Sequence, residues 1–265
     1  MNIVVPIKQV PETSNVKMDP VTGTIIRDGV ESIINPLDLY AIETAIQLKE
    51  TYGGKVTALT MGPPAAEKAL REAIAMGCDE GVLVSDRKFS GADTWSTAYV
   101  LVHAVKKLDD FDLIIAGERA TDGDTGQVGP AMASALDIPL ASYISRIDSV
   151  RADGMTVERL VEEGYETLEI DLPALLTVVK EISYPRLPTL RGKQKARNTE
   201  LPVLTAEDLE VEEVYLGLKG SPTRVVKIET PKVTRGGTIL KAVDEESMND
   251  AIEELVEFLK TREMI

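Results

Sequence analysis

The amino-acid sequence predicts an α/β protein with a doubly wound, mostly parallel sheet, an antiparallel extension, and an extended C-terminal arm plus helix. Short apolar runs alternate with helical periodicity in the first part of the chain, which implies parallel strands joined by right-handed crossovers. After residue 140, strand-like runs follow one another without helices, which predicts the antiparallel extension. Prolines become frequent from residue 183, and helical periodicity returns only near the end.

Each element of the first part has its own local signal. The apolar run 3–10 predicts a buried first strand, followed by a polar loop in which residues 24–27 are expected to form a short edge strand. Asn35 as N-cap and Pro36 as first helical residue predict a helix start, and Gly53 predicts its end. The same reasoning predicts further strands at 55–61, 81–84 and 113–116, and helices at 65–76 and 93–108.

The second part is expected to be more irregular. Strand-like runs at 140–147, 155–161, 167–171 and 174–179 predict the antiparallel extension. These runs complete a first domain, 1–182. Residues 183–241 are interpreted as an arm lying on another polypeptide, the alternative being a disordered tail. Residues 242–265 predict a terminal helix with one apolar stripe, which would dock on the same partner.

Composition excludes several classes of function. Lysine and arginine total 29 against 44 aspartate and glutamate residues, a net charge of −15, so nucleic acid is not an expected partner. One cysteine, Cys78, excludes an intrachain disulfide, and one histidine, His103, excludes a multi-histidine metal centre; no metal site is expected. The sequence shows no signal peptide, and no apolar stretch approaches the roughly 20 residues that span a bilayer. A cytoplasmic protein without membrane insertion is therefore expected.

The segment 117–130 is the most informative motif. It follows a buried strand, precedes a short helix, and contains Gly123, Gly126 and Gly129, which let the backbone approach a ligand closely. Thr125 is expected to cap the helix, whose first N–H groups would hold a diphosphate. The spacing matches neither a dinucleotide-binding G-x-G-x-x-G nor a Walker A loop, and by itself it is also compatible with a tight turn.

Two other strand ends and one helix start should reach the same edge of the sheet. Pro6 follows the first strand, Met61 ends the second, and Asn35 and Asp38 begin the helix between them. Taken singly, each of these residues is also explained by an ordinary structural role in a turn or a helix cap. Ligands of doubly wound sheets bind beyond the carboxyl ends of the strands, so the coincidence of these segments predicts a nucleotide-binding type of fold.

The order of these motifs resembles the β (small) subunit of electron transfer flavoproteins. The N-terminal Val-x-Ile-Lys-x-Val, Asn-Pro-x-Asp, Ala-Met-Gly-Cys-Asp at 75–79 and Asp-Thr-Gly-Gln-Val-Gly-Pro at 124–130 carry the likeness. The most specific match is the run 157–168, continuing through Pro-Ala-Leu-Leu-Thr at 173–177. The resemblance extends from residue 1 to about 200 and, loosely, to the arm and final helix.

The resemblance implies a heterodimer with a larger α subunit that carries the redox FAD. In the ordinary branch of the family the β subunit holds a structural AMP. In the electron-bifurcating branch of anaerobic metabolism it holds a second FAD that accepts a hydride from NADH. One electron then goes to ferredoxin or flavodoxin, and the other passes through the α-subunit FAD to an acyl-CoA dehydrogenase. The small residues of the 120–130 loop favour the second form.

Carried over position by position, the resemblance assigns cofactor contacts but no catalytic side chain, since the redox chemistry belongs to the flavin. The expected cofactor-binding residues are Pro6, Asn35, Asp38, Met61, Asp122, Gly123, Asp124, Thr125, Gly126, Gln127, Val128, Gly129 and Pro130. The family usually has a small residue at the position of Pro6, and proline removes an N–H that could recognise adenine.

A basic segment in this acidic chain is the third candidate site. The resemblance identifies this segment as the recognition loop that docks a partner, with Leu190 as the apolar anchor and Arg186, Arg191 and Lys193 around it. From the residues alone, the alternative is a solvated loop without a partner. Two other readings of the whole chain stay open. One is a β subunit with AMP, and the other a stand-alone regulatory module that binds adenine nucleotides. Whether the chain is an enzyme depends on this choice, because NADH oxidation by the heterodimer is implied only for the bifurcating branch.

Overall fold

The computed structural model describes residues 1–12, 32–108, 110–226 and 237–265. The chain divides into two compact units, Met1–Val226 and Lys227–Ile265. The edge strand expected at 24–27 lies outside the described residues. Among the described residues, no helix is both long and apolar enough to cross a membrane.

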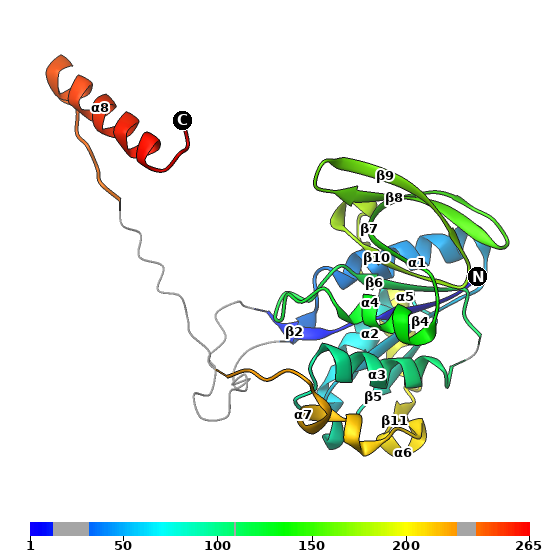
Figure 1. Ribbon diagram of the computed structural model, residues 1–265. Helices are drawn as coiled ribbons and strands as arrows, with labels where there is room; N and C mark the ends of the chain where they lie inside the picture. Colours follow the sequence, from blue (N-terminus) through cyan, green and yellow to red (C-terminus); the bar gives the residue numbers. More distant parts are fainter. Residues whose placement is uncertain (13–31, 109, 227–236) are drawn as a thin grey trace. The chain divides into compact units, whose positions relative to one another are not determined.

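The first unit is built on a mostly parallel sheet. In the described residues its strand order is β11-β5-β4-β1-β6-β10-β7-β8-β9, and every pair from β11 to β7 is parallel. The antiparallel strands β8 and β9 extend one end of the sheet, and β11 closes the other (Figure 1). The strands are β1 Asn2–Pro6, β4 Lys55–Met61, β5 Glu80–Val84, β6 Leu113–Gly117, β7 Leu140–Val150, β8 Gly154–Val161, β9 Gly164–Asp171, β10 Ala174–Val178 and β11 Val203–Leu204. A separate antiparallel pair joins β2 Gln9–Pro11 to β3 Ser32–Ile34.

Helices cover both faces of the sheet. The α-helices of this unit are α1 Asp38–Tyr52, α2 Glu67–Met76, α3 Thr94–Val105, α4 Val128–Leu136, α5 Leu190–Asn198, α6 Ala206–Leu209 and α7 Gly217–Gly220. Short 3₁₀ turns are η1 Pro64–Ala66, η2 Arg87–Phe89, η3 Lys180–Ile182 and η4 Glu213–Tyr215. One buried apolar cluster lies under α1, α2 and α5, and a second lies under α3, α4 and α6.

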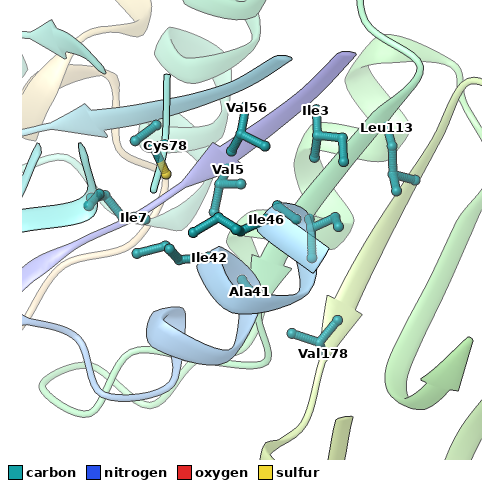
Figure 2. Packing of buried hydrophobic residues seen from close by; sticks show 14 of the residues in the cluster. Ile3, Val5, Ile7, Ala41, Ile42, Ile46, Val56, Cys78, Leu113 and Val178 are labelled. Carbon is teal, nitrogen blue, oxygen red and sulfur yellow. The ribbon is translucent and has the colours of Figure 1, made fainter. Parts of the chain in front are cut away.

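Alternation along the central strands explains the two clusters. Ile3 and Val5 of β1 pack in the first cluster, whereas Val4 between them packs in the second. Figure 2 shows Ile3 and Val5 facing Ile42 and Ile46 of α1. A strand buried on both faces reads as a continuous apolar run, which is why the sequence indicated parallel strands here.

Helix ends follow local chemistry in most places. Gly53, with φ of 73°, ends α1, and Gly77, with φ of 145°, ends α2, as glycine allows at these positions. Asp93 caps α3 by accepting from the Ser96 N–H. The expected cap at Asn35 is wrong: α1 begins three residues later, and only the Asn35 backbone carbonyl bonds the Asp38 N–H.

Two expectations about the second part need correction. Residues 174–178 do not join the antiparallel extension, since β10 inserts between β6 and β7 with parallel pairing. Every residue of β10 is buried, which requires cover on both faces and therefore a central place in the sheet. Residues 190–220 contain α5, β11, α6, η4 and α7, whereas the proline-rich sequence indicated little regular structure.

The second unit contains one helix, α8 Glu245–Thr261, in its described part. Asp244 begins it with a capping box, accepting from the Ser247 N–H while Ser247 Oγ accepts from the Asp244 N–H. Its apolar stripe is about half exposed, and consists of Met248, Ile252, Leu255 and Phe258. The helix and stripe predicted from the sequence are thus confirmed.

Candidate functional site

The start of α1 and the loop after β6 meet at the carboxyl edge of the sheet, and Asn35 joins them. Its side chain is fully buried. Asn35 Nδ2 donates to the Arg119 carbonyl at 2.9 Å, and Asn35 Oδ1 accepts from the Thr121 N–H at 3.0 Å. The loop is therefore tied to residues more than 80 positions earlier in the chain, and the Asn35 amide is used within the protein.

Asp38 completes this tie. Its Oδ1 accepts from Asn35 Nδ2 at 2.9 Å, and its Oδ2 accepts from the Lys8 N–H at 2.7 Å. Burial raises the pKa of Asp38 to about 7, although the hydrogen bonds from Asn35 and Lys8 oppose the shift. A Cβ at Gly117 would lie 2.4 Å from Asp38 Oδ1, so β6 needs glycine where it passes this carboxyl group.

Two cations stand beside the loop. Lys8 Nζ lies 2.6 Å from an Asp122 carboxylate oxygen, and Arg119 Nε lies 3.3 Å from an Asp124 carboxylate oxygen. These pairs offset the negative charge of the two aspartates, which would otherwise repel a phosphate. Sequence reasoning did not select Lys8 or Arg119, although both lie inside motifs that it singled out.

The glycine-rich loop leads directly into α4. Asp124 and Gly126 have positive φ, 53° and 61°, and bend the chain before the helix begins at Val128. Thr125 does not cap α4; the N-cap is Gln127, with no side-chain hydrogen bond. The first N–H groups of a helix have no intrahelical partner, and together with the positive end of the helix dipole they favour an anion.

Gly129 and Pro130 lie inside α4 rather than in the loop. A Cβ at Gly129 would lie 2.9 Å from Thr177 Cγ2, so this glycine lets α4 pack closely on β10. Its small size therefore serves helix–sheet packing. This weakens the sequence argument that Gly129 lets the backbone approach a ligand closely, while Gly123 and Gly126 remain in the loop itself.

The strand ends lie where the topology predicted. Pro6 is the last residue of β1 and is buried, and Met61 is the last residue of the neighbouring β4 and is half-buried. Thr60 Oγ1 donates to the Ile7 carbonyl at 2.8 Å, which joins the two ends. Met61 packs against the second apolar cluster.

Tyr143 is an aromatic residue that sequence reasoning missed. Its φ is 59°, an unusual value for a bulky residue, and its N–H donates to Thr177 Oγ1 at 3.0 Å beside a register shift between β7 and β10. A Cβ at Gly126 would lie 3.9 Å from the Tyr143 hydroxyl. The half-exposed ring thus stands next to the loop, and no sequence signal places it there.

The basic segment lies on the α1 and α2 side of the sheet. Leu190, Arg191 and Lys193 are exposed, and α5 packs on α2. Arg186 differs from them because its guanidinium binds Glu43 and Glu50 of α1. We call residues 184–190 the connecting segment, since they join η3 to α5.

A parallel sheet with a glycine-rich loop, a helix N-terminus and nearby cations at its carboxyl edge defines the nucleotide-binding class of α/β domains. The comparisons with known proteins are more specific. A family model described as electron transfer flavoprotein domain matches residues 22–209. The chain belongs to the electron transfer flavoprotein family, and within it to the β subunits.

The relatives are similar over their full length. The electron transfer flavoprotein subunit beta of Thermoanaerobacterium thermosaccharolyticum is 50% identical over 266 residues, covering 100% of both chains. The subunit beta of Megasphaera elsdenii is 44% identical over 272 residues, again 100% of both. The caffeyl-CoA reductase-Etf complex subunit CarD of Acetobacterium woodii is 42% identical over 266 residues, with the same complete coverage.

Proposed function

We propose that this chain forms a heterodimer with an electron transfer flavoprotein α subunit and holds a second FAD at the carboxyl edge of its sheet. The observation that carries the proposal is the loop 118–127, which is tied to Asn35 and opens into the N-terminus of α4. When bound, the flavin supplies the oxidation of NADH and the division of its electrons between ferredoxin or flavodoxin and the α-subunit FAD.

The residues present fit a diphosphate. Among the described residues, the backbone N–H groups of Gly126 and Gln127, which precede α4, donate no backbone hydrogen bond. Lys8 and Arg119 offset the negative charge of Asp122 and Asp124, which reduces the repulsion of a phosphate at the loop. Asn35 and Asp38 are buried, so we infer that they shape the loop and do not contact the nucleotide with their side chains.

We further propose that an acyl-CoA dehydrogenase accepts electrons from the heterodimer and docks on the connecting segment. The name of the Acetobacterium woodii relative refers to a complex with a caffeyl-CoA reductase, which supports an enzyme acting on an acyl-CoA as the partner. Leu190 is 87% exposed beside a proline-stiffened stretch, as expected for an apolar anchor.

The testing experiment is the stoichiometry of bound nucleotides in the purified αβ complex, by acid release, absorbance and mass spectrometry. We expect two FAD per heterodimer and no AMP. One FAD with one AMP would contradict the proposal and leave the chain as the non-redox half of a simple electron carrier.

Retention of the second FAD in two variants tests whether the nucleotide binds at this site. Lys8→Ala removes an exposed cation beside the loop and should lower retention of the second FAD several-fold, because phosphate binding loses charge. Lys180→Ala removes an exposed cation from η3 and should leave the stoichiometry unchanged. Equal retention in both variants would contradict the placement of the cofactor.

A further inference from the structure

The connecting segment presents apolar side chains to solvent. Tyr184, Leu187 and Leu190 are 93%, 85% and 87% exposed. Large apolar side chains this exposed on a short stretch indicate a contact surface for another protein. Such a surface binds well only if its backbone is ordered before the partner arrives, since ordering on binding costs affinity.

One residue in the middle of the segment faces the protein instead. Arg186 Nε donates to Glu43 Oε2 at 2.8 Å and Arg186 Nη2 donates to Glu43 Oε1 at 3.0 Å. The same guanidinium donates from Nη1 and Nη2 to the two carboxylate oxygens of Glu50, at 2.6 and 2.9 Å. Four of the five N–H donors of the guanidinium are thus directed to two carboxylates that lie two turns apart on the same face of α1.

The main chain is held by the same group. The Arg186 backbone N–H donates to Glu43 Oε2 at 3.0 Å, so both the backbone and the side chain of this residue are tied to one buried carboxylate. Gln47 Nε2 donates to Glu43 Oε1 at 2.8 Å and orients it from the next turn of α1. Burial by itself raises the pKa of Glu43, but the bonds from Arg186 and Gln47 outweigh it and lower the pKa, which keeps the carboxylate charged.

The segment is also fixed at its far end. Thr189 caps α5 by accepting from the Gly192 N–H at 2.9 Å, and the Thr189 N–H donates to the Ala75 carbonyl of α2 at 3.3 Å. The segment 184–190 is therefore attached to the protein at Arg186 and at Thr189. Tyr184 precedes the first attachment, Leu187 lies between the two, and Leu190 follows the second.

We propose that Arg186 is a positioning residue for partner docking: by binding Glu43 and Glu50 it holds the connecting segment in the conformation that presents Tyr184, Leu187 and Leu190. This inference rests on the proposed function. It assigns Arg186 a different role from Arg191 and Lys193, whose side chains are exposed. Its guanidinium acts through the apolar side chains and makes no partner contact of its own.

A double-mutant cycle in the assembled heterodimer tests this role. The dissociation constant for a purified acyl-CoA dehydrogenase is measured for wild type, Arg186→Ala, Leu190→Ala and the double variant. We expect each single change to weaken binding about tenfold, a typical loss at a contact centre. The double variant should be weakened by less than the product of the two single effects, because part of the Arg186 effect acts through Leu190. Multiplying effects would overturn the positioning role.

The effect of Glu50→Gln on the dissociation constant distinguishes a positioning role of Arg186 from a direct contact between Arg186 and the partner. Glu50 is exposed, and Glu43 would still hold Arg186, so the fold should be retained. A positioning role predicts weaker docking, because glutamine removes the charge and one of the two acceptor oxygens that bind the guanidinium at this position. A direct contact between Arg186 and an acidic partner predicts stronger docking, because the guanidinium is freed; that result would overturn the proposal.

Arg146→Ala is the matched control. Arg146 on β7 also binds two carboxylates, those of Asp148 and Glu158 at 2.5 and 2.9 Å, but outside the connecting segment. It should leave the dissociation constant unchanged, and an equal loss would overturn the specific role of Arg186. If wild type does not bind the dehydrogenase at all, the proposed docking function itself falls. If wild type binds and Leu190→Ala weakens it while Arg186→Ala does not, only the positioning role falls.

Discussion

At the scale of single residues, the buried pair Asn35 and Asp38 determines the shape of the candidate site. Both side chains are used to hold the chain together: one binds the loop after β6, and the other binds the N–H that follows β1. A carboxyl group with a pKa near 7 at this position makes the site sensitive to pH in the physiological range.

We therefore predict a pH-dependent difference in thermal stability between the wild-type heterodimer and Asp38→Asn. Burial raises the pKa of Asp38 from its ordinary 3.8 to about 7, so the folded protein holds the proton more tightly than the unfolded chain. The stabilisation from this proton is complete below about pH 4 and is lost as pH rises through about 7. The Tm of wild type minus that of the variant should fall by a few degrees between pH 5 and pH 8.

Scanning calorimetry in nucleotide-free buffers at fixed ionic strength measures this difference. Asp110→Asn is a control at the opposite edge of the sheet, where the carboxyl group is exposed. A difference in Tm that stays constant with pH for Asp38→Asn would contradict the raised pKa.

The sequence predicted that Asn35 and Asp38 lie at the start of α1, but it did not predict which groups their side chains bind. The Asn-Pro-x-Asp motif correctly indicated the approach to α1, and helix propensities suggested a local cap at Asn35. The structure uses the Asn35 amide for backbone groups of residues 119 and 121, which only the packing of β6 against β1 brings near. Tyr143 and the two cations were missed for the same reason.

At the scale of elements, α5 shows how a helix without helical sequence pattern is held. A glycine inside a helix is normally destabilising relative to alanine by about 0.5–1 kcal/mol. At Gly192 the contact with α2 reverses this preference, because a Cβ would lie 2.1 Å from the Ala75 carbonyl oxygen. The helix owes its existence to tertiary packing, which explains why the sequence indicated an arm there.

Gly192→Ala should consequently destabilise the protein although alanine is the better helix former. We expect a loss of about 1–3 kcal/mol in unfolding free energy, as for other overpacked sites, and weaker docking because α5 moves away from α2. Denaturant titration followed by circular dichroism measures the first effect. Gln194→Ala, an exposed position on the same helix, should be neutral or slightly stabilising. Equal stability of Gly192→Ala and wild type would show that α5 is not in close contact with α2.

The elements that pack on large apolar surfaces were predicted from the sequence more accurately than the short ones. Strands β1, β4, β5 and β6 and helices α1 to α3 carry strong periodicity because each packs on a large apolar surface. Strand β10 was assigned to the wrong part of the sheet, since an apolar run does not reveal its neighbours. The short elements β11, α6 and α7 have too few residues for any period to be visible.

At the scale of the whole molecule, α8 forms the described part of a separate unit and leaves an apolar stripe half exposed. A helix of this kind is stable in water mainly when its apolar face is buried against a partner. We propose that the α subunit of the heterodimer is that partner.

We predict that Leu255→Asp weakens association with the α subunit at least tenfold, because a charge would be placed in the centre of the stripe. Sedimentation of mixed subunits over a concentration series measures the affinity. Glu257→Ala, on the polar side of α8, is the control and should leave it unchanged. Wild-type affinity in Leu255→Asp would exclude the stripe from the subunit interface.

The place of β10 in the sheet has a consequence for how this chain is made. Strand β6 has β1 on one side and β10 on the other, and β10 follows β6 by more than 50 residues that include the whole hairpin of β8 and β9. While the ribosome is still adding those residues, one edge of β6 has no neighbour, and its unpaired backbone N–H and C=O groups are open to incorrect pairing. Until residues 174–178 have been added, the β6 edge that later pairs with β10 therefore lacks its native partner.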